Sequence, residues 1–423
     1  MLRAERLIDG IAAAPLEEAS VVISGETITA VGPTADVDVP VGAAVIDLGN
    51  RTVMPGLIDA HLHLLGVTDL MLDDVLEDEA YRAARAVGDL RKLLDAGFTA
   101  VRCVGSSIGP GLARAVRERW IDGPRIIAAG QFICSTTGTW DRLRLPASVL
   151  RTQDMLVDGV DECRSAVRRR TRAGSTVIKI GISAGRREDH LHQWGDSPFE
   201  QVVTLTVPET RAIVEEAERH GLMVAAHAIG DAAVRVALEG GVHTIEHGHA
   251  IDDRTLDTIA ERQVPLLSTL AAMTYIGDRG AELGMGPPVV EAAKRHSDEQ
   301  RRSFDKAVRA GARIAAGSDF VGPPLLTHGE NWIELVLMRD AGMKAMDVLR
   351  AATRTAAEAL GEQANIGTLE PGKRADLVVL NGDPLADMRA IENVHMVFQD
   401  GRPVAGMGLT SEASGLAVGA ALH

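Results

Sequence analysis

The chain of 423 residues is 46% hydrophobic and 24% charged, a composition typical of a folded globular protein with a large core. Its net charge is -15. A protein this acidic gains nothing from the counterion release that drives nucleic-acid binding, and an anionic membrane surface repels it. These two effects argue against a nucleic acid or a membrane as partner. Three scattered cysteines, no apolar leader and no apolar run of about 18 residues predict a cytoplasmic protein.

Both ends of the chain carry short β-type patterns broken by tight turns. Near the N-terminus, "SVVISGETITAVG" alternates Val, Ile and Thr on either side of Gly25 and Glu26, which is typical of a hairpin. The segments "KRADLVVLNGDP" and "VHMVFQDGRPV" repeat this pattern near the C-terminus. We therefore expect the two ends to form one composite β-sandwich domain of residues 1–54 and 368–410, followed by a loose tail of residues 411–423.

Strand-like and helix-like segments alternate between these ends, which predicts parallel βαβ units. The helix-like segments, such as "VPETRAIVEEAERHG", close with glycine, as helix C-termini often do. Eight apolar strand-like runs predict an α/β fold, a (β/α)8 TIM barrel, over residues 55–367. The runs are residues 57–64, 98–104, 125–130, 176–181, 222–228, 242–248, 264–270 and 312–319.

Two histidines lie one residue apart at the end of the first run, in "LIDAHLHLL". Because successive side chains of a strand alternate in direction, His61 and His63 are expected to point the same way. Either they are two polar residues at a solvated strand end, or they are the first half of a metal site.

Other side chains that can bind metal occur at later strand ends of the predicted barrel. The carboxyl ends of barrel strands converge on one mouth, so residues far apart in the sequence become neighbours there. A single histidine is more often an ordinary polar residue, and an Asp after Gly-Ser is often a turn residue, but their joint occurrence favours a zinc-type site. These residues are Lys179 in the fourth run, His227 at the end of the fifth, His247 at the end of the sixth and Asp319 at the end of the eighth.

Lys179 is the unusual member, because a lysine inside "TVIKIGI" would be buried. A buried ammonium is costly, so Lys179 either pairs with a carboxylate, reaches the barrel mouth, or loses its proton. A neutral amine can take up carbon dioxide and become a carbamate. Such an anionic group could bridge two divalent ions about 3.5–4 Å apart that share a hydroxide.

Several motifs resemble the metal-dependent amidohydrolase superfamily, and together they span almost the whole chain. The motifs are "VMPGLIDAHLHL", "IEHG", "AAGSDF" and "IGTLEPGKRADLVVLNGDPL". Within the superfamily, "VIKIGISAG" followed by "TVPETRAIVEEAERHGLMVAAHA" is similar to the binuclear branch with a carboxylated lysine. That branch includes Xaa-Pro and arginine-releasing dipeptidases and N-acyl amino acid hydrolases, and it is related to the imidazolonepropionases.

The resemblance implies a role for each candidate ligand in a site with two divalent ions, zinc being the expected metal. A metal-bridging hydroxide would attack an amide C–N bond of an N-acyl amino acid or dipeptide-like substrate. Asp319 would take the proton of this hydroxide and pass it to the leaving amine. The implied ligands are His61, His63 and Asp319 on the first ion, His227 and His247 on the second, and Lys179, carboxylated by CO2, bridging both.

Two positions depart from the pattern of that branch. Where many members have a Thr-Gly-Gly-His-Gly-Asp run after the third strand, this chain has "STTGTWD", with Thr139 in place of the histidine and Trp140 after it. Ile229 stands where the dipeptidases often have a tyrosine. These three residues, together with His249 and His328, are the candidate substrate contacts.

Two alternatives remain open at this stage. One keeps the fold but has a single metal ion, as in a deaminase or cyclic-amide hydrolase, with Lys179 only structural. The other is a non-catalytic scaffold homologue, which the complete ligand set disfavours. In either enzymatic case the expected partner is a small-molecule substrate, and the composition is compatible with a homo-oligomer.

Overall fold

The computed structural model describes residues 1–68, 76–141, 145–146, 154–186, 189, 194–324 and 326–406. The chain has the predicted α/β class, and the predicted tail of residues 411–423 lies outside the described residues. Among the described helices, none is both long enough and apolar enough to cross a membrane.

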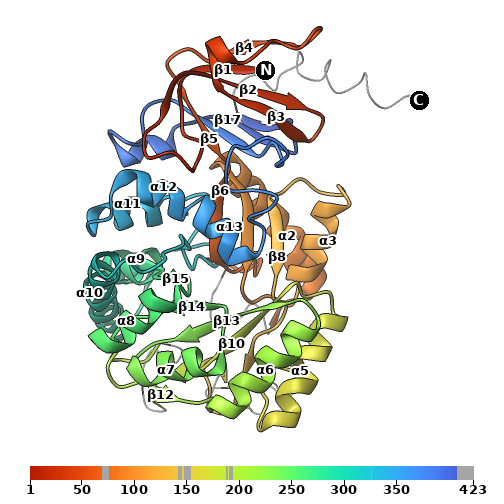
Figure 1. Ribbon diagram of the computed structural model, residues 1–423. Coiled ribbons are helices and arrows are strands. Elements are labelled where there is room, and N and C mark those ends of the chain that lie inside the picture. The colour runs from red at the N-terminus through yellow and green to blue at the C-terminus, as the bar shows by residue number, and fades with distance from the viewer. Residues whose placement is uncertain are drawn as a thin grey trace.

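Strands from both ends of the chain form one eight-stranded sheet at the top of Figure 1. Its order is β18-β17-β16-β5-β1-β2-β3, with β4 beside β1. The two ends meet where β5 and β16 pair antiparallel, with Val53 opposite Val379. The expected N-terminal hairpin is present, because Ser24 pairs with Thr27. The strands are β1 (Leu2–Leu7), β2 (Leu16–Ser24), β3 (Thr27–Pro33), β4 (Ile46–Asp47), β5 (Thr52–Pro55), β16 (Leu377–Leu380), β17 (Val394–Gln399) and β18 (Arg402–Gly406).

The middle of the chain contains two parallel sheets, β6-β7-β8 and β15-β14-β13-β10-β9. A short antiparallel pair, β11 and β12, lies beyond β10. Seven of the eight predicted strand runs therefore contain a strand. The strands are β6 (Leu57–Leu62), β7 (Phe98–Cys103), β8 (Arg125–Ala128), β9 (Ile133–Cys134), β10 (Val177–Gly181), β11 (Ser183–Ala184), β12 (Val202–Val203), β13 (Met223–Ala228), β14 (Thr244–His247) and β15 (Leu266–Leu267).

Backbone hydrogen bonds connect the edges of these two sheets. The amide of Thr176, just before β10, donates to the carbonyl of Ala128 at the end of β8 (2.8 Å). On the other side, Ala315 donates to Leu266 of β15 (3.0 Å), and Ala60 of β6 donates to Ala316 (3.0 Å). The segment around residues 314–320 therefore lies between β15 and β6.

The eighth predicted strand, residues 312–319, is not a continuous strand. It makes only isolated bridges, at Ile314 and at the neighbouring Phe320. The backbone turns at Asp319, which has φ 58°. It also passes so close to β6 that a Cβ on Gly317 would lie 2.6 Å from the His61 Cβ. This close approach replaces a regular ladder and brings Asp319 next to His61.

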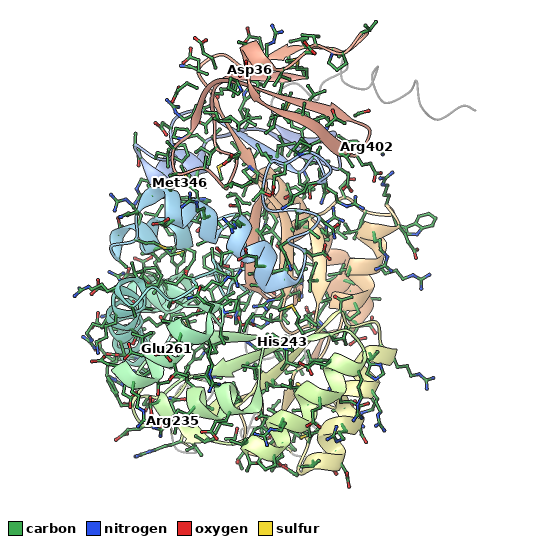
Figure 2. The ribbon with its side chains drawn as sticks, in the orientation of Figure 1. Asp36, Arg235, His243, Glu261, Met346 and Arg402 are labelled. Carbon is green, nitrogen blue, oxygen red and sulfur yellow. The ribbon has the colours of Figure 1, made fainter. Side chains whose placement is uncertain are left out.

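Helices surround the parallel strands, and charged side chains such as Arg235 lie at their periphery (Figures 1 and 2). The glycines expected after the helices are present: Gly97, Gly221 and Gly311 lie just beyond the ends of α2, α6 and α10, and their own φ angles are 90°, 70° and 72°. The helices are α2 (Glu79–Asp95), α3 (Gly109–Arg117), α5 (Val160–Arg172), α6 (Val207–Arg219), α7 (Asp231–Gly240), α8 (Asp253–Arg262), α9 (Leu270–Arg279), α10 (Pro287–Arg309), α11 (Ile333–Asp340), α12 (Ala345–Ala351) and α13 (Arg354–Leu360), with 3-10 turns η1 (Thr34–Asp36), η3 (Gly280–Leu283) and η4 (Met388–Glu392).

Gly317→Ala is expected to lower the free energy of unfolding by about 1–3 kcal/mol, because the added methyl group would overlap the backbone of His61. Urea denaturation measures this change. Gly88→Ala is the matched control: Gly88 is exposed in α2 with no atom within 4 Å of the new Cβ, so this variant should gain about 0.5–1 kcal/mol. A Gly317→Ala protein as stable as the wild type would contradict the close approach.

Candidate functional site

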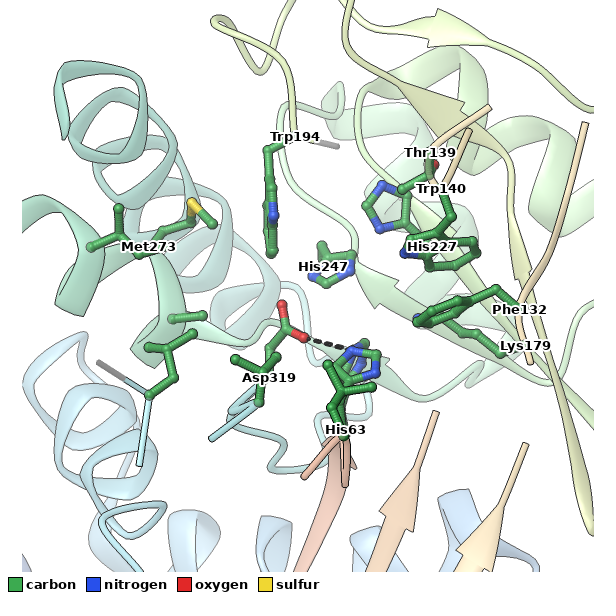
Figure 3. A pocket seen from close by; sticks show the side chains of 16 residues that line it. His63, Phe132, Thr139, Trp140, Lys179, Trp194, His227, His247, Met273 and Asp319 are labelled. Atoms are coloured by element: carbon green, nitrogen blue, oxygen red, sulfur yellow. Dashed lines mark hydrogen bonds and ion pairs between the residues drawn. The ribbon is translucent and has the colours of Figure 1, made fainter. Parts of the chain in front are cut away.

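One pocket collects all six predicted metal ligands at the ends of the parallel strands (Figure 3). It has an empty volume of about 750 Å³, including the part open to solvent. Thr139 and Trp140 also line it, as expected from the sequence. The candidate ligands among its walls are His61, His63, Lys179, His227, His247 and Asp319.

His61 and His63 face the Asp319 carboxylate from the end of β6. The Asp319 Oδ1 lies 3.3 Å from Nε2 of His61 and 3.1 Å from Nε2 of His63. The Nδ1–H of His63 donates to the carbonyl of Gly105 (3.0 Å). Because a carbonyl can only accept, His63 carries a proton on Nδ1, which leaves Nε2, the atom that faces Asp319, as the nitrogen able to bind a metal ion.

His227 and His247 form the other half of the group. Their ring centroids are 4.5 Å apart, and the His247 ring lies 5.0 Å from that of His61. Nδ1 of His247 hydrogen-bonds to the hydroxyl of Thr269 (2.8 Å), whereas Nε2 of His227 is buried with no partner among the described residues. A buried imidazole nitrogen without a partner is costly, so this nitrogen fits a ligand that the described residues do not supply.

The electrostatics of the pocket favour neutral imidazoles and an ionised carboxylate. Burial lowers the pKa of His63, and it lowers those of His227 and His247 well below the usual value. Burial alone would raise the pKa of Asp319, but His61 and His63 reverse this and lower it. These are the protonation states that bind a divalent cation.

Lys179 lies fully buried in β10, and its Nζ has no hydrogen-bond partner among the described residues. Burial lowers the pKa of Lys179 to about 8, although the charges of Glu246 and Asp319 oppose this effect. The pairing with a carboxylate that would explain a buried lysine structurally is therefore not made by a direct hydrogen bond. An orphaned amine inside a group of ligand residues fits a modified, metal-bridging lysine.

Among the described residues, His61, His247 and Asp319 form one group of possible metal donors, with one ligand atom from each within 4.8 Å of the others. The resemblance to the binuclear branch implies instead that His247 binds a different ion from His61 and Asp319. The division of the ligands between two ions therefore stays a prediction. The donor set itself, imidazole and carboxylate, suits zinc and similar divalent ions.

Two residues that the sequence reasoning missed orient His61. Nδ1 of His61 donates to Oε2 of Glu246, whose Oε1 accepts from the fully buried guanidinium of Arg102 (2.7 Å). Burial alone would raise the pKa of Glu246, but Arg102 and His61 lower it far below the usual value. A carboxylate behind a ligand histidine fixes its tautomer and orientation. Glu246 was visible in the "IEHG" motif, beside the predicted ligand His247.

A second network, also missed, joins β6 to the segment that carries Asp319. Oδ1 of Asp59 accepts from the amides of His61 (3.0 Å) and Ser318 (3.1 Å). Its Oδ2 accepts from the Ser318 hydroxyl (2.6 Å) and from Nδ2 of Asn331 (2.7 Å). The buried carboxylate of Asp59 thus fixes the backbone of His61 relative to that of Ser318, the residue before Asp319.

Three predicted substrate contacts do not line the pocket. Ile229 is fully buried, and its amide donates to the Ser183 hydroxyl (2.8 Å). His249 hydrogen-bonds instead to His296 of α10 (3.0 Å between Nε2 and Nδ1). Nε2 of His328 donates to the carbonyl of His63 (3.1 Å), so it supports the backbone of a candidate ligand.

Glu246→Gln is expected to cost about 3 kcal/mol of stability, because buried Arg102 loses its counter-charge. It should also weaken zinc binding by about 10–100-fold, because His61 loses its orienting carboxylate. Denaturation and competition with a zinc chelator measure the two effects. Glu215→Gln is the control, since Glu215 pairs with Arg164 at the surface, where solvent screens the pair, and its loss should leave both stability and zinc binding nearly unchanged. Equal zinc affinity in both variants would contradict the role of Glu246.

Several proteins similar to this chain are named as enzymes. The ochratoxinase of Aspergillus niger is 28% identical over 93% of this chain and 84% of that enzyme, and its crystal structure superposes with a TM-score of 0.84. A Xaa-Pro dipeptidase with methionine bound in the active site is 30% identical, with a TM-score of 0.84 over 95% of this chain and 98% of that one. A prolidase complexed with N-methylphosphonate-L-proline is 32% identical, with a TM-score of 0.83 and the same coverage.

The amidohydrolase family matches residues 52–404, which include every candidate ligand and all strands of the two parallel sheets, but not β1–β4. This match confirms the resemblance that the motifs indicated. The chain belongs to the amidohydrolase family, and it is a metal-dependent hydrolase that acts on carbon–nitrogen bonds.

Proposed function

We propose that this protein hydrolyses the amide bond of N-acyl amino acids or dipeptide-like substrates with two divalent ions, zinc being the expected metal. One observation carries the proposal: six ligand side chains line a single pocket, and two of their buried nitrogens, Nζ of Lys179 and Nε2 of His227, have no partner among the described residues. Both atoms have the chemistry to complete a metal site, Lys179 after reaction with CO2.

When bound, the two ions would supply a hydroxide at neutral pH and polarise the scissile carbonyl. The residues of the chain hold and move the proton. Asp319, ionised and within 3.3 Å of two imidazoles, is the base that takes the proton of the nucleophile and returns it to the leaving amine. His61, oriented by Glu246, and His63, oriented by the Gly105 carbonyl, keep their free nitrogens on this side of the pocket.

The substrate class rests on the relatives. Two of them, the dipeptidase and the prolidase, are named for peptide substrates, and the prolidase is complexed with N-methylphosphonate-L-proline, a proline substituted at its nitrogen. The ochratoxinase is named for a toxin. A shared site for an acylated amino acid nitrogen is compatible with these names and with the amide chemistry of the family.

The proposal includes the finer architecture. We infer that the parallel strands and the segment of residues 312–319 form a closed (β/α)8 barrel of residues 55–367. The hydrogen bonds from Thr176 to Ala128 and from Ala60 to Ala316 support this closure. The sheet formed by both ends supports a composite domain of residues 1–54 and 368–410. Cytoplasmic location and a homo-oligomeric state stay predictions.

The mononuclear alternative is supported by the compact group of His61, His247 and Asp319, which could hold one ion alone. Metal analysis separates the two readings. Protein purified with excess zinc should contain about two equivalents per chain if the site is binuclear. One equivalent, with full activity, would favour a mononuclear deaminase or cyclic-amide hydrolase.

Lys179→Ala is expected to reduce amide hydrolysis by at least about 1,000-fold, because the bridge between the two ions is lost. Short carboxylic acids such as propionate should restore part of the activity by taking the place of the carbamate. A screen of N-acyl amino acids and dipeptides with the zinc- or manganese-loaded protein supplies the assay. Lys306→Ala, at an exposed lysine of α10 paired with Asp253, is the control and should keep wild-type turnover. Near wild-type activity of Lys179→Ala would overturn the binuclear proposal.

A further inference from the structure

The pocket has aromatic walls, although aromatic residues are rare in this chain. Aromatic side chains make up 3% of the sequence, and only four are tryptophans. Two of the four, Trp140 and Trp194, line this one pocket together with Phe132. Of the other two, Trp120 is exposed at the surface and Trp332 packs against the core. Metal binding does not require these rings, so their concentration here calls for another explanation.

Phe132 and Trp140 form a stacked pair on one side of the pocket. Their ring centroids are 3.9 Å apart and their planes differ by 15°. The pair touches the metal ligands, since the Trp140 ring lies 6.0 Å from that of His227 and the Phe132 ring 5.5 Å from that of His63. The stack is therefore a wall immediately beside the reacting centre.

The backbone makes room for both rings of this stack. A Cβ on Gly105 would lie 1.8 Å from the Phe132 ring, and a Cβ on Gly181 would lie 3.0 Å from the Trp140 ring. Trp140 itself stands where the Thr-Gly-Gly-His-Gly-Asp run of related chains has a glycine. Each ring of this wall is therefore accommodated by a glycine elsewhere in the chain, Phe132 by Gly105 and Trp140 by Gly181.

Trp194 forms the opposite wall, as Figure 3 shows. Its ring lies 4.8 Å from that of His247. The backbone around it is anchored, because Nε2 of Gln201 donates to its carbonyl (2.6 Å) and Nε2 of His296 donates to the carbonyl of Gly195 (3.0 Å). The remaining lining near this wall is aliphatic or thioether: Met273, Ile276, Val321 and Leu326.

We propose that the space between Trp194 and the Phe132–Trp140 stack binds a flat apolar ring of the substrate. The preferred substrates are then amides with an aromatic group next to the scissile bond. This inference rests on the proposed function, since the amide must lie at the metal ligands for its ring to reach this slot. Aromatic rings gain from offset or edge contacts with other rings beyond their burial of apolar area, whereas a short aliphatic group would leave both walls facing water.

Binding of product-like carboxylates tests the slot without turnover. Isothermal titration calorimetry of the zinc-loaded protein compares 2-naphthoate with propionate, which present the same carboxylate to the metal site. Naphthoate should bind at least about tenfold more tightly. Trp194→Ala should lose most of this difference and Trp194→Phe should keep most of it. Trp120→Ala, at the exposed tryptophan, is the matched control and should behave as wild type. Equal binding of the two ligands, or no effect of Trp194→Ala, would overturn the proposal.

Turnover separates this inference from the proposed reaction. Three substrates are compared. N-acetyl-L-alanine has no aromatic ring, N-benzoyl-L-alanine has one on the acyl side of the scissile bond, and N-acetyl-L-phenylalanine has one on the amine side. At least one aromatic amide should exceed N-acetyl-L-alanine about tenfold in kcat/KM, mainly through KM. Similar rates for all three would overturn the aromatic slot and leave amide hydrolysis standing. Tight naphthoate binding without hydrolysis of any amide would overturn the proposed amide hydrolysis and leave the aromatic slot standing.

Discussion

The pairing of Arg102 with Glu246 is the interaction on which the site depends. Both side chains are fully buried, and burial of an unpaired charge there would cost several kcal/mol. Arg102 of β7 also donates to the Ala60 carbonyl of β6 (2.6 Å) and to the Thr244 hydroxyl of β14 (3.0 Å). The Arg102 guanidinium thus connects three strands beneath the pocket. It occupies only Oε1 of Glu246, so Oε2 can accept the hydrogen bond from Nδ1 of His61.

Two of the candidate ligands, His247 and Asp319, have an unusual backbone conformation. His247 and Asp319 both have positive φ, 71° and 58°, a conformation that side chains other than glycine rarely adopt. Such strain persists only where the surroundings enforce it, and it is concentrated at functional sites. Here the Thr269 hydroxyl holds the His247 ring, and the carbonyl of His61 accepts from the Asp319 amide (2.7 Å). The pocket is therefore preorganised by the protein.

The sequence predicted those parts of the molecule whose cause is local. Alternation placed His61 and His63 on one face. The order of the parallel runs predicted that His227 and His247 at strand ends, Lys179 inside the fourth run and Asp319 after the eighth would meet at one mouth. The local turn signals also predicted the hairpin at Gly25. These expectations needed only the periodicity of strands and the position of turns.

What the sequence could not predict comes from contacts between distant strands. Arg102 carries no signal in its own segment, and although Glu246 lies in the "IEHG" motif, nothing local predicts that the two side chains pair beneath the pocket. The eighth run looks like a strand in composition, but the tight passage of Gly317 over His61 bends it away from a regular ladder. Ile229, His249 and His328 follow ligands or strand ends in sequence, yet each turns to a protein partner instead of the pocket.

The antiparallel pairing of β5 with β16 has a consequence for how the protein matures. β5 leads directly into β6 and the first two histidines, but its partner strand lies more than three hundred residues later in the chain. Contacts of such high sequence separation form late and slowly. Asp319, the acidic candidate ligand beside these two histidines, also lies far along the chain, in the segment between β15 and α11. The pairing of β5 with β16, and the contact of His61 with Asp319, can therefore form only after most of the chain has been made.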